Sequence, residues 1–443
     1  MKINLNLRMS SVVRCSVLIS ALAYSSINAN QLYANIVWLL ILGNIVLNDD
    51  ETNLYFLTGL SIFEYAIQFM SSIMIFPLFI VASIKLLYKK KGQLSRDCFC
   101  PLAILLVLEL INDFFRVPIL NMANLISIIL YVAILIDMLP NLNIRIDEFS
   151  LIYYIAYFIA IISTITTYGS FSTFVYVLRQ VDYTRFGGTT RYLTGGAMGI
   201  PLYSLIVLSI ELTQITKIFH ANNLFRKIIS ILIMIVTLSI GVFSQSRIFI
   251  ICIVAIMIWL GLFSFKTRGK SFVPFILLCF MIIIMVFTQG SLIDEFLARI
   301  NGRFETVFLM DGTSRLDIYL SCLNYLKRNP LRLMFGTGNL YYSILGTAIQ
   351  QAFSKTAHNL ILDGIMGYGI VGFSCIILLY TSLSKKLGSK YRYNEERFLN
   401  SMPLFVLFIH SLTADTFSVC KTWLLLIMLI CYKYIPVGGS YDS

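Results

Sequence analysis

Charged side chains are scarce in this 443-residue chain: Asp, Glu, Lys and Arg together make up 13% of it, against roughly 25% of an average soluble domain. Residues of the set AVILMFWYC make up 58%. A water-soluble protein of this length needs more charge to cover its surface, and a disordered chain carries fewer apolar residues. Soluble globular, fibrous and disordered classes are therefore excluded, and the composition predicts a polytopic membrane protein.

Several motifs that carry chemistry are also missing. The chain contains no phosphate-binding P-loop, no HExxH, no paired CxxC and no DxD of the kind that holds a metal-bound nucleotide sugar. Cys98 and Cys100 form a lone CxC, which is too little for a zinc site. Cys322 is the one cysteine of its long polar loop, so no internal disulfide can hold that loop. We expect no metal, no other cofactor and no nucleic-acid partner.

Long apolar runs recur along the whole chain. A helix needs roughly 20 residues to cross a hydrocarbon core of about 30 Å. Because lipid offers no hydrogen-bond partners, the backbone of each run must bond to itself, which predicts a helix. The runs lie at 10–28, 30–47, 57–84, 98–115, 118–139, 149–168, 197–216, 228–243, 248–265, 271–288, 357–380, 398–412 and 416–434. The prediction is an all-α protein of about 12 transmembrane helices, in a single transmembrane domain over 1–443.

Clusters of Lys and Arg in the connections predict which side each connection faces. The clusters are separated by even numbers of runs and lie at 85–96, 217–227, 266–270 and 385–397. All of them can then be cytoplasmic, as is the C-terminus, while the segment 48–56 is expected outside. Arg14 interrupts the first run, so an amphipathic segment in the membrane interface is favoured there over a span or a cleaved signal peptide.

Two loops are expected on the outer face, at 169–196 and 289–356. Loops as long as the second are uncommon unless they are functional. An amphipathic helix is predicted within it, capped by Thr313 or Ser314 and ended by Pro330. Its apolar residues at helical spacing are Leu316, Tyr319, Leu320, Leu323 and Leu326.

Arginine is concentrated on the outer face, whereas the cytoplasmic clusters are mainly lysine. The outer arginines are Arg116, Arg179, Arg185, Arg191, Arg247, Arg299, Arg303, Arg315, Arg328 and Arg332. Because a planar guanidinium grips phosphate oxygens in pairs, this distribution favours a phosphate-bearing ligand outside. The alternative to phosphate binding, for each of these arginines, is a structural ion pair with a nearby Asp or Glu. Arg247 is the exception, because its tight turn has no acidic residue nearby in sequence.

Histidine, the usual general base near neutral pH, occurs only three times. His220 lies in a cytoplasmic loop, and His410 lies near the end of a span, where it either packs or supports another residue. His358 lies where the long outer loop joins the run 357–380, beside the arginine-rich loop. It is the leading candidate for a base, with a helix-capping or interfacial role as the alternative.

The outer-face motifs follow one another in a characteristic order. They are Ser246-Arg247, Arg303-Phe304, Ser314-Arg315, the turn Phe335-Gly336-Thr337-Gly338, and His358-Asn359 leading into the glycine-rich segment 364–372. This order resembles the O-antigen polymerase and O-antigen ligase superfamily, the Wzy and WaaL type of membrane glycosyltransferase, over roughly residues 228–380. The resemblance implies a GT-C-like, metal-independent enzyme of the bacterial inner membrane. Its active site would face the periplasm, and its donor would be an undecaprenyl-diphosphate-linked oligosaccharide.

The resemblance also implies roles for single residues. Arg247 and Arg315 would contact the diphosphate, with Arg303 and Arg185 as secondary candidates, and His358 would be the base on the acceptor hydroxyl. A polymerase, which adds glycan to another lipid-linked repeat, is favoured over a ligase, which adds it to lipid A–core. Expected partners are the lipid-linked glycan, membrane lipid and a chain-length regulator protein.

A flippase or other transporter of lipid-linked oligosaccharide is the competing class. That class expects charged residues within the spans, and the chain offers Glu64, Glu109, Asp113, Asp137 and Glu211. It does not account for a long arginine-rich outer loop with a histidine at its end. A structural scaffold in a glycan-assembly complex is the third alternative.

Overall fold

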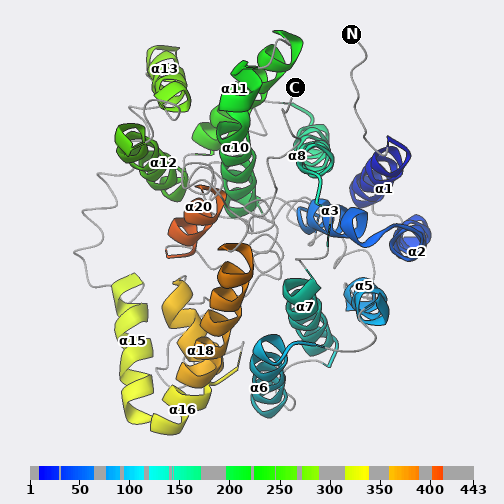
Figure 1. Ribbon diagram of the computed structural model, residues 1–443, viewed down its shortest axis with the longest axis vertical. Coiled ribbons are helices and arrows are strands. Elements are labelled where there is room, and N and C mark those ends of the chain that lie inside the picture. The colour runs from blue at the N-terminus through cyan, green and yellow to red at the C-terminus, as the bar shows by residue number, and fades with distance from the viewer. Residues whose placement is uncertain are drawn as a thin grey trace, which may run out of the picture. The chain divides into compact units, whose positions relative to one another are not determined.

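The computed structural model describes residues 9–28, 31–63, 76–89, 94–113, 119–138, 142, 144–170, 196–220, 224–244, 246–266, 272–288, 315–338, 359–388 and 402–412. The regular secondary structure of these residues is all helical, as the sequence predicts (Figure 1). The chain divides into two compact units. Unit 1 comprises 1–199, 374–397 and 419–443, and unit 2 comprises 200–373 and 398–418.

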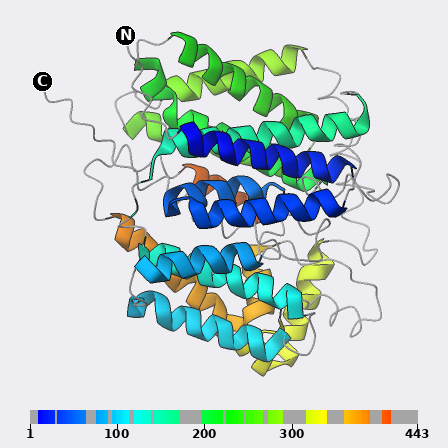
Figure 2. The same ribbon diagram turned by 90° about the vertical axis from the view of Figure 1, so that its right-hand side faces the viewer.

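Unit 1 is built mainly from the N-terminal helices. These are α1 (Met9–Asn28), α2 (Gln31–Leu47), α3 (Asp50–Ser61), α5 (Phe76–Lys89), α6 (Arg96–Asp113), α7 (Ile119–Met138) and α8 (Ile146–Tyr168). Helix α1 packs on α2 and α8, α5 packs on α2 and α7, and α6 packs on α7. Figure 2 shows α1, α2 and α5 running side by side. Large aromatic side chains fill the centre of the unit, among them Tyr55, Phe56, Tyr131, Tyr153 and Tyr157.

Unit 2 contains the helices that follow, together with part of α18. They are α10 (Gly196–His220), α11 (Leu224–Phe243), α12 (Arg247–Lys266), α13 (Phe272–Thr288), α15 (Arg315–Arg328), α16 (Pro330–Phe335), α18 (Leu360–Gly388) and α20 (Met402–Ser411). Helix α12 packs on α13 and α20 around Phe249, Ile256 and Val406. Trp259 stacks on Phe405 with ring centroids 4.2 Å apart. Residues 374–388 of α18 belong to unit 1.

Most predicted runs coincide with helices to within a few residues. Within the described residues, three helical segments are long and apolar enough to cross a membrane: Asp147–Thr167, Leu224–Phe243 and Leu360–Leu379. Shorter apolar helices accompany them, including Ser10–Ser25 and Leu32–Leu47. This is the architecture of a polytopic membrane protein. The run 416–434 lies outside the described residues, and the count of 12 spans stays a prediction.

The run predicted at 57–84 is not one helix. It is divided between α3, which ends at Ser61, and α5, which begins at Phe76. Helix α3 has 12 residues, a length of about 18 Å, which is too short to cross the hydrocarbon core. Its residues from Thr52 to Leu60 are buried, and it packs on α8. A hydropathy window averages over such a break, so the sequence analysis merged the described helices α3 and α5 into one long span.

Polar contacts join the end of α2 to the end of α5. Lys85 Nζ donates hydrogen bonds to the carbonyl oxygens of Ile45 at 2.9 Å and Val46 at 3.0 Å, and to that of Asn48. Lys89 forms an ion pair with the buried Asp50. The lysine thus satisfies carbonyl groups that the last turn of α2 leaves without helical partners.

These contacts correct the predicted sidedness of one segment. The sequence placed 48–56 outside and 85–91 in the cytoplasm, but an ion pair between Asp50 and Lys89 requires both to lie on the same side. Arg14 Nη2 also donates to Asn48 Oδ1 at 3.0 Å, so α1 and α2 form an antiparallel pair. Helix α1 buries a stripe of Val12, Cys15 and Ile19. Such a stripe fits a span and an amphipathic interfacial segment alike, so the placement of α1 stays a prediction.

The corrected topology makes a prediction about the α1–α2 connection. If 85–91 is cytoplasmic, Asn30 lies outside and the basic N-terminus lies inside, which satisfies the positive-inside rule. In a cysteine-free background, a cysteine at Asn30 should react with a membrane-impermeant maleimide in spheroplasts. Matched cysteines at Arg116 and Lys91 serve as the outside and inside references. Protection of the residue-30 cysteine until the cells are permeabilised would refute this topology.

Candidate functional site

The α11–α12 connection is a tight hairpin, as the sequence predicts. Ser244 Oγ donates to the Gly241 carbonyl oxygen at 2.5 Å, and Ser246 Oγ accepts from the Phe249 amide at 3.4 Å, at the start of α12. The Phe249 ring lies over Gly241, where an added Cβ would come within 2.0 Å of it. Arg247 is therefore fixed as the first residue of α12.

The start of α18 is fixed by Asn359. Its Oδ1 accepts from the amides of Ile361 and Leu362, both at 3.1 Å, which is the N-cap arrangement. Its own amide donates to Asp363 Oδ2 at 2.9 Å, and its Nδ2 donates to the Leu412 carbonyl oxygen at 3.2 Å. The residue that follows His358 is thus held both to the first turn of α18 and to the end of α20.

The glycine turn of the outer loop is bonded to an interruption in α18. The helix has non-helical dihedral angles at Gly369, with φ 68° and ψ −179°. Upstream of this break, the Met366 carbonyl oxygen accepts from the Thr337 amide at 2.8 Å and from Thr337 Oγ1 at 2.6 Å. The Gly338 amide donates to the Gly367 carbonyl oxygen at 3.0 Å. Two segments of the family-like motif therefore lie side by side.

Glycine is required on both sides of this crossing. Gly336 has φ 81°, and an added Cβ would lie 2.2 Å from the Gly367 carbonyl oxygen. A Cβ on Gly369 would lie 2.3 Å from the Met334 carbonyl oxygen. Both contacts are with backbone atoms, which cannot move away as a side chain can. The close approach of the two backbones explains why the motif contains these glycines.

Helices α15 and α16 pack on the first turns of α18 (Figure 1). The amphipathic helix predicted in this loop is confirmed, and Pro330 begins α16. The predicted face is right in part: Leu326 is buried with Ile318 and Cys322 around Met366, and Tyr319 packs against them. Leu320 and Leu323 were assigned to the same face, but they are 49% and 54% exposed. The helix carries two apolar stripes, and only the packing on α18 selects one of them. The predicted caps Thr313 and Ser314 lie outside the described residues.

Cys322 is a free cysteine and lies buried in this contact. Burial raises the pKa of its thiol to about 12, and the negative charge of Asp363 acts in the same direction. A neutral thiol between α15 and α18 is a packing group, since the thiolate is the nucleophilic form.

The described structure does not test the roles that the sequence assigned to five residues. His358, Arg303 and Arg185 lie outside the described residues. Arg247 and Arg315 are the first residues of α12 and α15, and their side chains lie outside the described part of the chain. Their roles therefore stay predictions. Within the described residues, no group of His, Cys, Asp or Glu is placed to hold a metal ion.

Arg332 is a site candidate that the sequence reasoning counted among the outer arginines without giving it a role. It is partly buried on α16, and its Nη1 lies 3.4 Å from the Gly336 carbonyl oxygen. The Gly336 amide in turn donates to the Arg332 carbonyl oxygen at 2.8 Å. A signal was present in the sequence, because an arginine one helical turn before a glycine turn can reach the carbonyl groups of that turn.

Replacing Gly336 by alanine tests the importance of the crossing. The new Cβ meets backbone at 2.2 Å in a left-handed conformation, so we expect Gly336→Ala to destabilise the protein by about 2–4 kcal/mol. Gly43→Ala on α2 is the matched control, because its Cβ would meet nothing within 4 Å. Thermal melts of the purified variants measure the difference. Equal melting temperatures would contradict the described contact.

The raised pKa of Cys322 predicts low reactivity. Below pH 9 the buried thiol stays protonated in the folded protein, so it should react with maleimide far more slowly than the exposed Cys100. Mass spectrometry of detergent-purified protein after timed labelling checks this, and denaturation should bring the two rates together. Comparable rates in the folded protein would exclude the packed position of Cys322.

Comparison with known protein families gives one match, to the family model Wzy_C, described as O-antigen ligase, over residues 229–377. The matched segment includes α12, α13, α15, α16 and most of α11. It also includes the N-cap residue Asn359 and the first part of α18, with the break at Gly369. A comparison with curated proteins finds none that matches the chain. Residues 229–377 therefore match the Wzy_C family of O-antigen ligases and polymerases, whose members are membrane glycosyltransferases of polysaccharide synthesis.

Proposed function

We propose that the chain is a surface-polysaccharide polymerase of the bacterial inner membrane, with its active site on the periplasmic side. It would transfer a glycan from undecaprenyl diphosphate to a sugar hydroxyl of another lipid-linked repeat, without a metal ion. The observation that carries the proposal is the bonding of the turn Gly336–Gly338 to the break in α18. This bond holds the long outer loop against the helix that begins directly after His358.

The proposed reaction needs one base and one group of cations. His358 takes the proton of the acceptor hydroxyl while the acceptor oxygen bonds to the anomeric carbon of the donor. The bond from that carbon to the diphosphate oxygen breaks, and undecaprenyl diphosphate leaves. Arg247 and Arg315, with Arg303 and Arg185 as secondary contacts, offset the negative charge that develops on the leaving group. Preplaced cations of this kind usually contribute the larger part of the rate.

The described contacts are consistent with two of these roles, because they fix the main chain beside His358 and Arg247. Asn359 anchors the position after His358 through Leu362 and Leu412. The Ser244 and Ser246 hydroxyls fix the turn that presents Arg247. Arg332, bonded to the glycine turn, is an additional candidate for the diphosphate contact. Chemistry that depends on orientation needs a rigid scaffold of this type.

A ligase that transfers the glycan to lipid A–core is the second candidate, since the matched family model is described as O-antigen ligase. Both enzymes bind the same diphosphate-linked donor, so the donor-binding motifs do not distinguish a ligase from a polymerase. We favour the polymerase because polymerases diverge more in sequence and carry fewer recognisable motifs, and the shared motifs are incomplete in this chain. Asp363 is the one acidic residue in the first turns of α18. A chain-length regulator protein is the expected partner of a polymerase.

Deletion of the gene distinguishes the candidates by the surface polysaccharide on a gel. Loss of a polymerase leaves single repeats on the lipid A–core, whereas loss of a ligase leaves none. A flippase mutant would retain its lipid-linked repeats on the cytoplasmic side of the membrane. Single repeats on the core are the expected result.

Complementation of the deletion tests the assigned residues. Arg247→Ala and Arg315→Ala should each lower the polymerisation rate by about 10²–10³-fold, and His358→Ala by about 10²–10⁴-fold. Arg226→Ala, at an exposed position in the first turn of α11, is the control and should restore long chains. Normal long chains from an Arg247→Ala, His358→Ala double variant would refute the catalytic assignment.

A further inference from the structure

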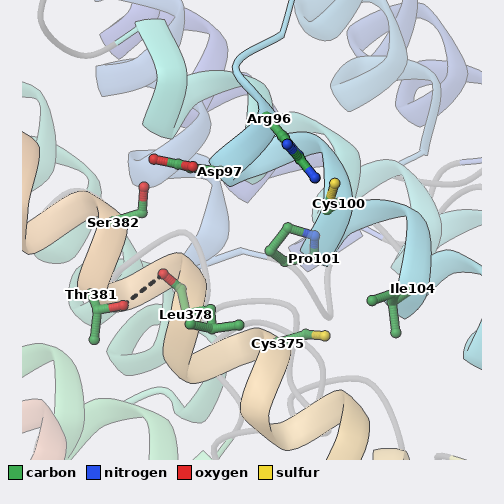
Figure 3. A pocket seen from close by; sticks show the side chains of 9 residues that line it. All are labelled: Arg96, Asp97, Cys100, Pro101, Ile104, Cys375, Leu378, Thr381 and Ser382. Carbon is green, nitrogen blue, oxygen red and sulfur yellow. Dashed lines mark hydrogen bonds between the residues drawn. The ribbon is translucent and has the colours of Figure 1, made fainter.

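Unit 1 contains a cavity of about 420 Å³ between α6 and the last turns of α18 (Figure 3). This volume lies within the range of small-molecule binding sites. The lining residues come from the start of α6 and from the part of α18 that belongs to unit 1. They are Arg96, Asp97, Cys100, Pro101, Ile104, Cys375, Leu378, Thr381 and Ser382.

The wall of the cavity is amphipathic. In Figure 3, Arg96, Asp97 and Ser382 lie on one side of the cavity, whereas Cys375, Leu378 and Ile104 lie on the other. The Thr381 hydroxyl donates to the Leu378 carbonyl oxygen at 2.9 Å. Ile104 is 40% exposed and Leu378 is 54% exposed. In helices that cross a membrane, exposed apolar side chains of this kind face acyl chains. The cavity therefore has a charged end toward water and an apolar end toward lipid.

The two charged residues are adjacent in sequence but point in different directions. In Figure 3, Arg96 extends toward Cys100, while Asp97 extends toward the side on which Ser382 lies. Both side chains are exposed, and no ion pair joins them. A simple anion or a simple cation would meet one attractive and one repulsive charge here. A ligand that carries both charges a few ångströms apart would meet two attractive ones.

The position of the cavity along the membrane normal also matters. Arg96 follows the basic segment 85–91, and Ser382 precedes the basic segment 385–397, both of which the charge distribution places in the cytoplasm. The charged end is then at the level of the cytoplasmic lipid headgroups, where pockets with basic residues between helices bind lipid phosphate. This is the opposite face from the proposed transferase site.

We propose that this cavity is a binding site for a phosphatidylethanolamine-type lipid of the cytoplasmic leaflet. Arg96 binds the phosphate and Asp97 accepts hydrogen bonds from the primary ammonium group. The Ser382 hydroxyl borders the headgroup, and an acyl chain lies along Ile104 and Leu378. The site is independent of the transferase proposal, and its occupation can be measured without polysaccharide synthesis.

The chemistry of the headgroup separates this lipid from other common ones. Phosphatidylglycerol has the phosphate but no cation, so its negative charge is repelled by Asp97. Phosphatidylcholine has a cation whose three methyl groups remove every N–H donor that Asp97 could bind. Phosphatidylethanolamine alone among the three supplies a partner for both side chains. Charge-assisted hydrogen bonds of this kind are stronger than neutral ones.

Native mass spectrometry of the purified full-length protein, titrated in detergent with dioleoyl forms of the three lipids, tests the proposal. We expect phosphatidylethanolamine to bind about ten-fold more tightly than the other two. Binding of the wild-type protein should weaken stepwise with the N-methyl, N,N-dimethyl and N,N,N-trimethyl forms of the headgroup. This series needs no variant, so folding defects cannot affect it. Equal binding of all forms would overturn the proposal.

Two variants assign the charges. Asp97→Asn should remove the preference for phosphatidylethanolamine over phosphatidylglycerol, whereas Arg96→Gln should weaken both lipids about ten-fold. The matched controls are Asp147→Asn and Arg226→Gln, which remove the same charges from the first turns of α8 and α11. These controls should bind like the wild type. If Asp97→Asn keeps the full preference, or if Asp147→Asn loses it too, the assignment is wrong.

Discussion

Backbone polar groups that lie in hydrocarbon must find their hydrogen-bond partners within the protein, because lipid supplies none. Most of the chain meets this requirement with helices. Where a helix ends or breaks among other helices, a side chain or a second stretch of backbone completes the bonding. Lys85 does so for the last carbonyl groups of α2, and Thr337 does so for Met366 beside the break in α18. These two places are also where the fold departs from a simple series of spans.

The break in α18 connects this constraint to the proposed chemistry. A continuous helix would have used the Met366 carbonyl group internally, and the outer loop would have had nothing to bind there. With Gly369 outside the helical region, Thr337 and Gly338 fasten the loop to α18 by main-chain bonds. Asn359 fixes the beginning of the same helix. A loop that carries the phosphate-binding arginines of a glycosyltransferase needs such an attachment, because misplacement by an ångström is costly for catalysis.

The charge distribution gives the two membrane faces different proposed chemistry. On the face predicted to lie outside, arginines dominate, and the proposal assigns four of them to a diphosphate leaving group. On the face predicted to be cytoplasmic, lysines dominate the basic clusters, while Arg96 and Asp97 are exposed residues of opposite charge in the wall of an amphipathic cavity. The outer face would thus bind the glycan donor that the reaction consumes, and the cytoplasmic face would bind a phospholipid that does not react. Both proposals depend on the same physical fact, that phosphate at a membrane surface is held by preplaced cations.

Hydropathy alone located most of the helices, because a span must be apolar over its whole length, and it identified the membrane class from composition. The order of the glycine and arginine motifs was also readable, since glycine is required where two backbones touch, as at Gly336 and Gly369. Tertiary structure decided the rest. The division of 57–84 into α3 and α5, and the side on which 48–56 lies, depend on contacts of Lys85 and Asp50 with residues distant in sequence. Likewise, α15 offers two apolar stripes, and only its packing against Met366 determines that Cys322 is buried and Leu323 is exposed.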